Sequence, residues 1–259
     1  MNFKLKSLIV LFISIVLIYT ACKKSNTNPS TKTLSTKSVS SQVALNISGS
    51  LFGSGGAFNI TKGINAPTTY SVHTKQRVVN DLNNIYCGKV IDTTLNYTFK
   101  QNDTTVSITG SMKFTFICVN NVLTGFNTDD VLNINLTSSQ LIATEKVSEK
   151  FTLLSLNPSD SNSQFSINGT LSSNASLQYK ASSDKNGTAV FSYTLNTLII
   201  DPNADSDVVS GSATFATSGT SADGAWNYSG TIVFLGNHLA TITINNIAYN
   251  VNLQTGVVS

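Results

Sequence analysis

Apolar and polar residues alternate along most of the chain after about Val43, and this period-two pattern constrains the fold most strongly. Clear runs lie at 95–99, 106–118, 226–234 and 249–253. In a β-strand, successive side chains point to opposite faces, so alternation marks a strand with one buried face. Repeated this often, it predicts an all-β protein made of antiparallel strands.

Short polar turn sequences separate these runs at intervals of roughly 8–14 residues, which suits a curled meander, a β-sandwich or an open barrel. A glycine also recurs inside the segments 47–51, 108–112, 167–171, 209–213 and 228–232, where it would permit a strand to bend or bulge. The turn sequences are Asn102-Asp103, Asn120-Asn121, Asn186-Gly187, Asp223-Gly224 and Asn245-Asn246.

Composition supports the same fold class and excludes some functions. Charged residues make up 11% of the chain and the net charge is +3, so no polybasic surface for nucleic acid is expected. Strong helix formers are scarce. We expect at most one or two short helices, the better candidate at 74–86 and a weaker one at 139–151, which could equally be a strand.

The first 21 residues have the layout of a secretory signal peptide. Lys4 and Lys6 precede an apolar stretch at 8–19, and the small residues Thr20 and Ala21 lead into Cys22. The apolar stretch is short for a membrane span of about 20 residues, although an uncleaved anchor helix is the alternative.

The sequence around this cysteine, IYTACKKSN, resembles the lipobox of bacterial lipoproteins, with Tyr19 where leucine is usual. The resemblance implies that Cys22 becomes the first mature residue and carries diacylglycerol and an amide-linked acyl chain such as palmitate. Lys23 and the absence of a following acidic run favour the outer membrane, facing the periplasm. The cell surface is the alternative. The only partner this implies is the membrane, reached through the lipid.

Residues 22–40 are polar and poor in apolar side chains, which predicts a flexible tether after the lipidated cysteine. Residues 41–259 are then expected to form a single all-β domain. In an exported protein, the remaining pair Cys87 and Cys118 is interpreted as a disulfide. The alternative, a reactive thiol pair, lacks the CxxC spacing and a nearby activating His or Arg.

One short run has the oxygen-rich spacing of a calcium loop. Calcium takes six to eight oxygen ligands, and the sequence DPNADSD supplies alternate candidates. It lacks the glycine and glutamate that complete such a loop, so a solvated strand connection is the competing interpretation, and no other cofactor is expected. The candidate ligands are Asp201, Asn203, Asp205 and Asp207.

No catalytic motif stands out, so the chain is not expected to be an enzyme. His73 and His238 are far apart in sequence and lie in no metal or triad motif, and His238 fits an exposed hairpin turn. Two carboxylates could act together on a glycosidic bond, but nothing in the sequence selects a pair. The possible members are Asp92, Asp129, Asp130, Glu145 and Glu149.

The chain as a whole resembles an uncharacterised group of Bacteroidota lipoproteins. The resemblance rests on IYCGKVIDTT at 85–94, on Cys118 and on the tail from Val209. It implies an exported, all-β, disulfide-bonded body and supplies no site residues. Two Asp-Thr-Thr sequences also resemble the O-glycosylation acceptor of that phylum, which makes Thr93 and Thr104 candidate glycosylation sites.

These observations predict a lipid-anchored protein of the cell envelope that acts as a non-catalytic binding or structural module. The first alternative is a periplasmic carrier that holds an apolar ligand in a curled sheet. A polysaccharide-active enzyme is the second alternative. Whether a partner would be a protein, a glycan or an apolar molecule stays open.

Overall fold

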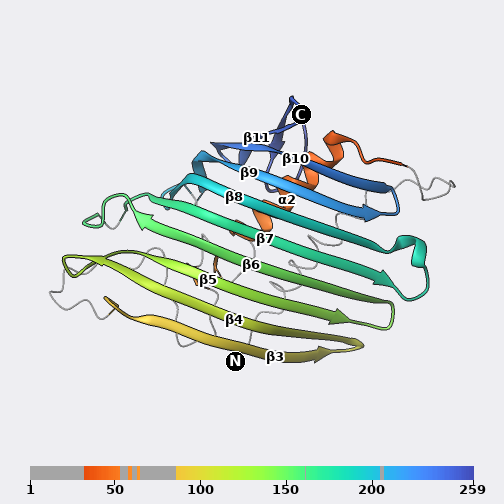
Figure 1. The fold of residues 1–259 in the computed structure, drawn as a ribbon, viewed down its shortest axis with the longest axis horizontal. Coiled ribbons are helices and arrows are strands. Elements are labelled where there is room, and N and C mark those ends of the chain that lie inside the picture. The colour runs from red at the N-terminus through yellow and green to blue at the C-terminus, as the bar shows by residue number, and fades with distance from the viewer. Residues whose placement is uncertain (1–31, 53–57, 60–62, 65–85, 161, 205–206) are drawn as a thin grey trace.

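A computed structural model describes residues 32–52, 58–59, 63–64, 86–160, 162–204 and 207–259. The expected signal peptide, Cys22 and most of the helix expected at 74–86 lie outside these ranges. The described chain forms one curled, unclosed ten-stranded antiparallel sheet in which each strand pairs with the next along the chain (Figure 1). The all-β curled meander is therefore confirmed.

The elements follow one another in a simple order, with one α-helix before the sheet in the described part of the chain. A small separate ladder pairs β1 with β2. The bounds are α2 Thr36–Phe52, β1 Phe58–Asn59, β2 Gly63–Ile64, β3 Val90–Gln101, β4 Thr104–Val119, β5 Val122–Thr137, β6 Leu141–Ser155, β7 Phe165–Tyr179, the 3₁₀ turn Ser183–Lys185, β8 Gly187–Asp201, β9 Asp207–Ser221, β10 Gly224–Gly236, β11 Leu239–Ile244 and β12 Ile247–Asn252.

Strands β4 to β9 have 15 or 16 residues each and are about 50 Å long. Their alternation gives the sheet two unlike faces. We call the face that carries the buried apolar side chains the inner face, and the opposite, polar face the outer face. Inner-face side chains from all ten strands of this sheet and from α2 form one continuous core. Its fully buried members include Phe114, Phe191, Tyr193, Leu195, Leu198, Ile232 and Ile242.

Asparagine-rich turns join the strands, as the sequence predicts. Asn120 and Asn121 both have positive φ, and so do Asn245 and Asn246. Two such residues make a type I′ turn, whose twist matches that of antiparallel strands. Asn tolerates this conformation because its side chain is short and polar. The turns thus set the register in which each strand meets the next.

The predicted mid-strand glycine effect is confirmed at Gly169. The β7–β8 register shifts between Ile167 and Gly169, and Gly169 has a φ of +148°. A Cβ atom there would lie 2.3 Å from the carbonyl oxygen of Lys150, so only glycine fits against β6. The corresponding expectation for 47–51 is wrong because that segment is helical.

Helix α2 corrects the interpretation of the chain before the sheet. It begins at Thr36, so the last residues of the expected tether and the start of the expected β domain form one helix. Ser35 caps it, because its Oγ accepts the backbone N–H of Ser38 at 3.1 Å. One face of the helix is buried in the core through Val39, Val43, Ala44, Ile47 and Leu51. The weaker helix expected at 139–151 is instead mostly β6.

The helix lies on the inner side of the sheet and contacts its C-terminal strands, β11 and β12 (Figure 1). Ser41 Oγ donates to the carbonyl of Gly256 at 2.6 Å, and the hydroxyls of Thr36 and Tyr249 lie 2.5 Å apart. Tyr193, fully buried on β8, donates to Asn46 Oδ1 at 2.9 Å. Helix α2, near the start of the described chain, is therefore bound to the C-terminal strands β11 and β12 and to the tail after them.

Residues 32–34 are also fixed to the body. Thr33 bridges Ala225 on β10, and the hydroxyl of Tyr228 donates to the carbonyl of Leu34 at 2.9 Å. Any free tether after Cys22 must therefore end before Lys32, which is earlier than the boundary expected at residue 40. No helix among the described residues is long and apolar enough to cross a membrane.

The disulfide between Cys87 and Cys118 is confirmed, with its Cα atoms 5.6 Å apart. It joins the turn before β3 to the end of β4. Since β3 has a single neighbouring strand among the described strands, this bond fixes the start of the edge strand to the body.

Replacing both Cys87 and Cys118 by Ala should lower the free energy of unfolding by about 3–4 kcal/mol, because the unfolded chain then loses a closed loop of about 32 residues. Denaturant unfolding of both proteins, with and without reductant, measures this difference. Reductant should shift the wild type to the variant's midpoint. A midpoint unchanged by reductant in both proteins would contradict a stabilising role.

Candidate functional site

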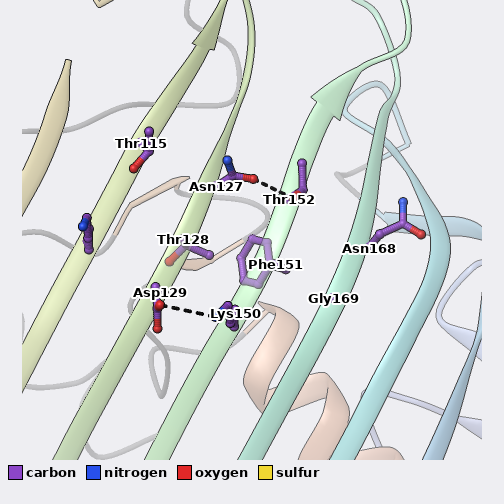
Figure 2. Close-up of a pocket in the computed structure, with 10 residues that line it drawn as sticks. Thr115, Asn127, Thr128, Asp129, Lys150, Phe151, Thr152, Asn168 and Gly169 are labelled. Carbon is purple, nitrogen blue, oxygen red and sulfur yellow. Dashed lines mark hydrogen bonds and ion pairs between the residues drawn. The ribbon is translucent and has the colours of Figure 1, made fainter. Parts of the chain in front are cut away.

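An open groove of about 400 Å³ runs over strands β4 to β7 on the outer face (Figure 2). Most of the residues that line it have polar side chains, because the outward positions of these strands carry Lys, Asp, Asn and Thr. Its lining residues are Lys113, Thr115, Asn127, Thr128, Asp129, Lys150, Phe151, Thr152, Asn168 and Gly169.

Three charged side chains form a row across the groove. Lys113 on β4 is the register partner of Asp129 on β5, which is in turn the partner of Lys150 on β6. Lys150 Nζ lies 3.7 Å from Asp129 Oδ2, and both side chains are largely exposed. An exposed pair of this kind contributes little to stability. The row leaves the groove with one more cation than anion.

The amide groups of the groove have their acceptor oxygens already engaged. Thr152 Oγ1 donates to Asn127 Oδ1 at 2.6 Å. Asn168 Oδ1 accepts both the backbone N–H and the hydroxyl of Thr197, at 2.8 and 3.2 Å. The two Nδ2 groups have no acceptor among the described residues and remain donors. The groove therefore presents mainly hydrogen-bond donors.

One groove residue, Asn168, is held in place by a residue with a strained backbone conformation. Thr197 has a φ of +49°, an unfavourable conformation for a β-branched residue. It lies where the β8–β9 register shifts, and its two hydrogen bonds to Asn168 hold that side chain in place. Strain of this kind concentrates at functional sites.

Behind the groove, on the inner face, two carboxylates occupy directly opposed positions. Asp130 on β5 and Glu149 on β6 are register partners, and they are only 1% and 2% exposed. Asp130 Oδ1 accepts the backbone N–H of Lys113 at 2.8 Å, and Oδ2 accepts the hydroxyl of Thr128. Burial raises the pKa of Asp130 to about 6 despite these hydrogen bonds.

Glu145 lies on the same face of β6, four residues before Glu149. Burial raises its pKa, while a hydrogen bond from Ser173 Oγ at 3.0 Å acts in the opposite direction. Two opposed carboxylates, one with a raised pKa, resemble the groups used for acid–base chemistry. Asp130 and Glu149 are both buried, so a polymeric substrate could not reach them in this conformation.

Asp130→Asn should stabilise the protein at pH 7. The folded pKa of Asp130 exceeds its unfolded value near 3.8. The folded state therefore binds more protons between about pH 4 and 6, and the wild type loses stability as the pH rises through this window. We expect the variant to gain about 1–3 kcal/mol at pH 7 and little at pH 4. Thermal unfolding at both pH values measures the difference.

Asp129→Asn is the matched control because it removes the neighbouring carboxylate, which is exposed on the outer face. It should change the pH dependence of stability far less than Asp130→Asn. Equal effects of the two substitutions, or a destabilised Asp130→Asn at pH 7, would contradict the assigned burial of Asp130.

The other residues singled out by sequence are dispersed. Asp201 accepts Gln164 Nε2 and the backbone N–H of Asn203, at 3.1 and 2.8 Å, which lowers its pKa. Buried Asp207 instead accepts the backbone N–H of His238 at 2.9 Å. Asp205 lies outside the described residues. Among the described residues, no three His, Cys, Asp or Glu side chains are placed to hold a metal ion.

His238 is in the expected hairpin turn, but it is half-buried where an exposed side chain was expected. Its Nδ1 lies 3.2 Å from Asp207 Oδ1, and its ring meets Phe52 of α2 edge to face. Of the candidate glycosylation sites, Thr104 lies at the β3–β4 hairpin and donates to Asp103, while Thr93 is half-buried within β3.

Sequence reasoning included Asp129, Asp130 and Glu149 among its candidate carboxylates, but it missed the groove. Lys113, Asn127 and Asn168 carry no motif, and only the pairing of four strands brings them together. Comparison with protein-family models, curated proteins and solved structures finds no match to this chain.

Proposed function

We propose that this protein is a lipid-anchored, non-catalytic binding module of the cell envelope, and that it binds a polar ligand in the outer-face groove. The observation that carries the binding role is the donor-rich lining of that groove. Lys113 and Lys150 contribute ammonium groups, and Asn127 and Asn168 contribute amide N–H groups.

The ligand class follows from this lining. Donors exceed acceptors in this lining, where Asp129 is the one carboxylate, so it suits a ligand rich in acceptor oxygens, and the surplus cation favours one that is anionic. A groove that is open along a broad sheet suits a chain better than a compact molecule. An acidic glycan, with carboxylate and ring-hydroxyl oxygens along its length, meets all three requirements.

The alternatives find less support. A carrier of an apolar ligand needs a cavity of several hundred Å³ with a predominantly apolar lining. The groove has the volume, but eight of its ten lining residues have polar side chains, and the described inner-face core is filled by its own side chains. A polysaccharide-active enzyme needs carboxylates that its substrate can reach, and Asp130 and Glu149 are buried.

Lys113→Ala should weaken the binding of an acidic oligosaccharide by about fivefold or more, because it removes a charged hydrogen bond from the groove. Oligogalacturonate is the probe, and maltooligosaccharide of equal length is the neutral comparison. Isothermal titration at low and high salt measures both affinities, and added salt should weaken only the acidic ligand.

Lys146→Ala is the matched control. Lys146 is exposed on the outer side of β6, four residues from Lys150, and it does not line the groove. This variant should bind like the wild type. Equal losses in the two variants would indicate non-specific attraction, and failure of oligogalacturonate to bind the wild type would exclude this ligand class.

The anchoring part of the proposal predicts that Cys22→Ser moves the protein from the membrane to the soluble fraction. Cell fractionation followed by mass spectrometry of the N-terminal peptide measures this, and the wild-type peptide should carry the mass of attached acyl chains. Since residues 32–34 are bound to β10, nine residues would separate the lipid from the body, a reach of at most about 30 Å. An unmodified wild-type Cys22 would overturn the anchor.

A further inference from the structure

The two edge strands of the sheet, β12 and β3, differ in length and in what pairs with them. At one edge, β12 is short and the chain's own tail pairs with it, since Ser259 N–H donates to the carbonyl of Asn250 and Val251 bridges Val258. At the other edge, β3 is twelve residues long and has β4 as its one neighbour in the ten-stranded sheet (Figure 1). Its register with β4 has no bulge, and the strand contains no proline.

No other described strand pairs with this edge, so among the described residues β3 has a row of backbone groups without a strand partner. The carbonyl of Lys89 accepts the N–H of Phe116, so odd-numbered residues turn their backbone groups toward β4. Because this direction alternates along an antiparallel strand, even-numbered residues direct their N–H and C=O outward. Natural sheets usually block such an edge with a bulge, proline or several charges. After Val90, the even-numbered residues are Asp92, Thr94, Asn96, Thr98 and Lys100, all with exposed side chains.

These five residues are complementary to the same five residues of a second, antiparallel copy of β3. If a second copy of β3 runs antiparallel with Asn96 opposite Asn96, then Asp92 lies opposite Lys100 and Thr94 lies opposite Thr98. The two-fold axis repeats each of these pairs, so both charges of each copy meet an opposite charge. Opposite charges stabilise a cross-strand pair, and like charges destabilise it.

The side chains on the inner face of β3 are also complementary between the two copies. In this register Leu95 lies opposite Tyr97 of the second copy, and Thr93 lies opposite Phe99. Tyr97 is 43% exposed in the single chain, which is unusual for a tyrosine beside an apolar core. Pairing would cover it with an aliphatic side chain. Backbone groups, charges and apolar side chains thus select one register.

We propose that two copies of this protein associate through β3, antiparallel and centred on Asn96, to form one continuous sheet across a two-fold axis. Such an interface is isologous, because each copy contributes the same surface. The proposal is independent of the ligand groove, since none of the ten groove residues belongs to β3.

Cysteine cross-linking of the full chain tests the register. Asn96→Cys places the two new thiols directly opposite each other, where a hydrogen-bonded pair has Cα atoms about 5.5 Å apart, within disulfide range. Thr94→Cys is the matched control on the same strand and side. Its two copies would be four residues out of step, about 13 Å apart, which is too far for a disulfide.

After mild oxidation of membranes with copper phenanthroline, Asn96→Cys should give a covalent dimer on a non-reducing gel. Thr94→Cys and the wild type should stay monomeric. Equal cross-linking of the two variants would indicate random collision of the copies and would contradict this register. The absence of a dimer from Asn96→Cys would overturn the proposal.

Exchanging the charges at positions 92 and 100 tests whether the partner is a second copy of this chain. Lys100→Asp alone, or Asp92→Lys alone, puts like charges at both symmetry-related pairs and should weaken self-association about tenfold or more. Mixing the two variants restores both pairs, because one copy then has lysine at 92 and 100 and the other has aspartate. Co-purification of differently tagged full chains in mild detergent should therefore recover the mixed pair and not the single variants. Recovery that ignores charge would exclude this interface, and unchanged melting temperatures verify that the variants are folded.

Discussion

The register of ten consecutive antiparallel strands is the constraint on which the rest of the structure depends. Because side chains alternate strictly, a slip of one residue between any two strands would exchange their inner and outer faces. It would place Phe114 in solvent and Lys113 in the core. The asparagine turns and the disulfide hold this register at the strand ends. The shift beside Gly169 adjusts it in the middle.

The fold was largely predictable because it rests on local signals. Period-two alternation gave the strands, and paired asparagines gave their turns. Helix α2 was missed although Val39, Val43, Ile47 and Leu51 repeat at intervals of four residues. Serine and β-branched residues dilute its helix propensity, and the sequence around Gly49 imitates a pattern that is truly extended elsewhere. Burial against β11 and β12 decides the helix, and no local signal reports that contact.

The candidate site was less predictable for a different reason. Each groove residue is ordinary in its own strand, and its meaning depends on the residue opposite. Asp129 and Asp130 illustrate this, because neighbours in sequence lie on opposite faces, one paired with Lys150 in solvent and the other buried with a raised pKa. Sequence reasoning could name both carboxylates but could not separate their roles without the strand pairing.

The contacts between α2 and the C-terminal strands have a consequence for the order of folding. Each strand pairs with its neighbour in sequence, so the sheet can grow as the chain emerges from the ribosome or a translocation channel. The helix is made early, yet its partners Tyr249 and Gly256 are more than 200 residues later. It must wait beside a growing sheet until the last hairpin arrives. The β11–β12 hairpin and the tail after it therefore act as the closing step of folding, and a chain that stops before them would leave the helix without these contacts.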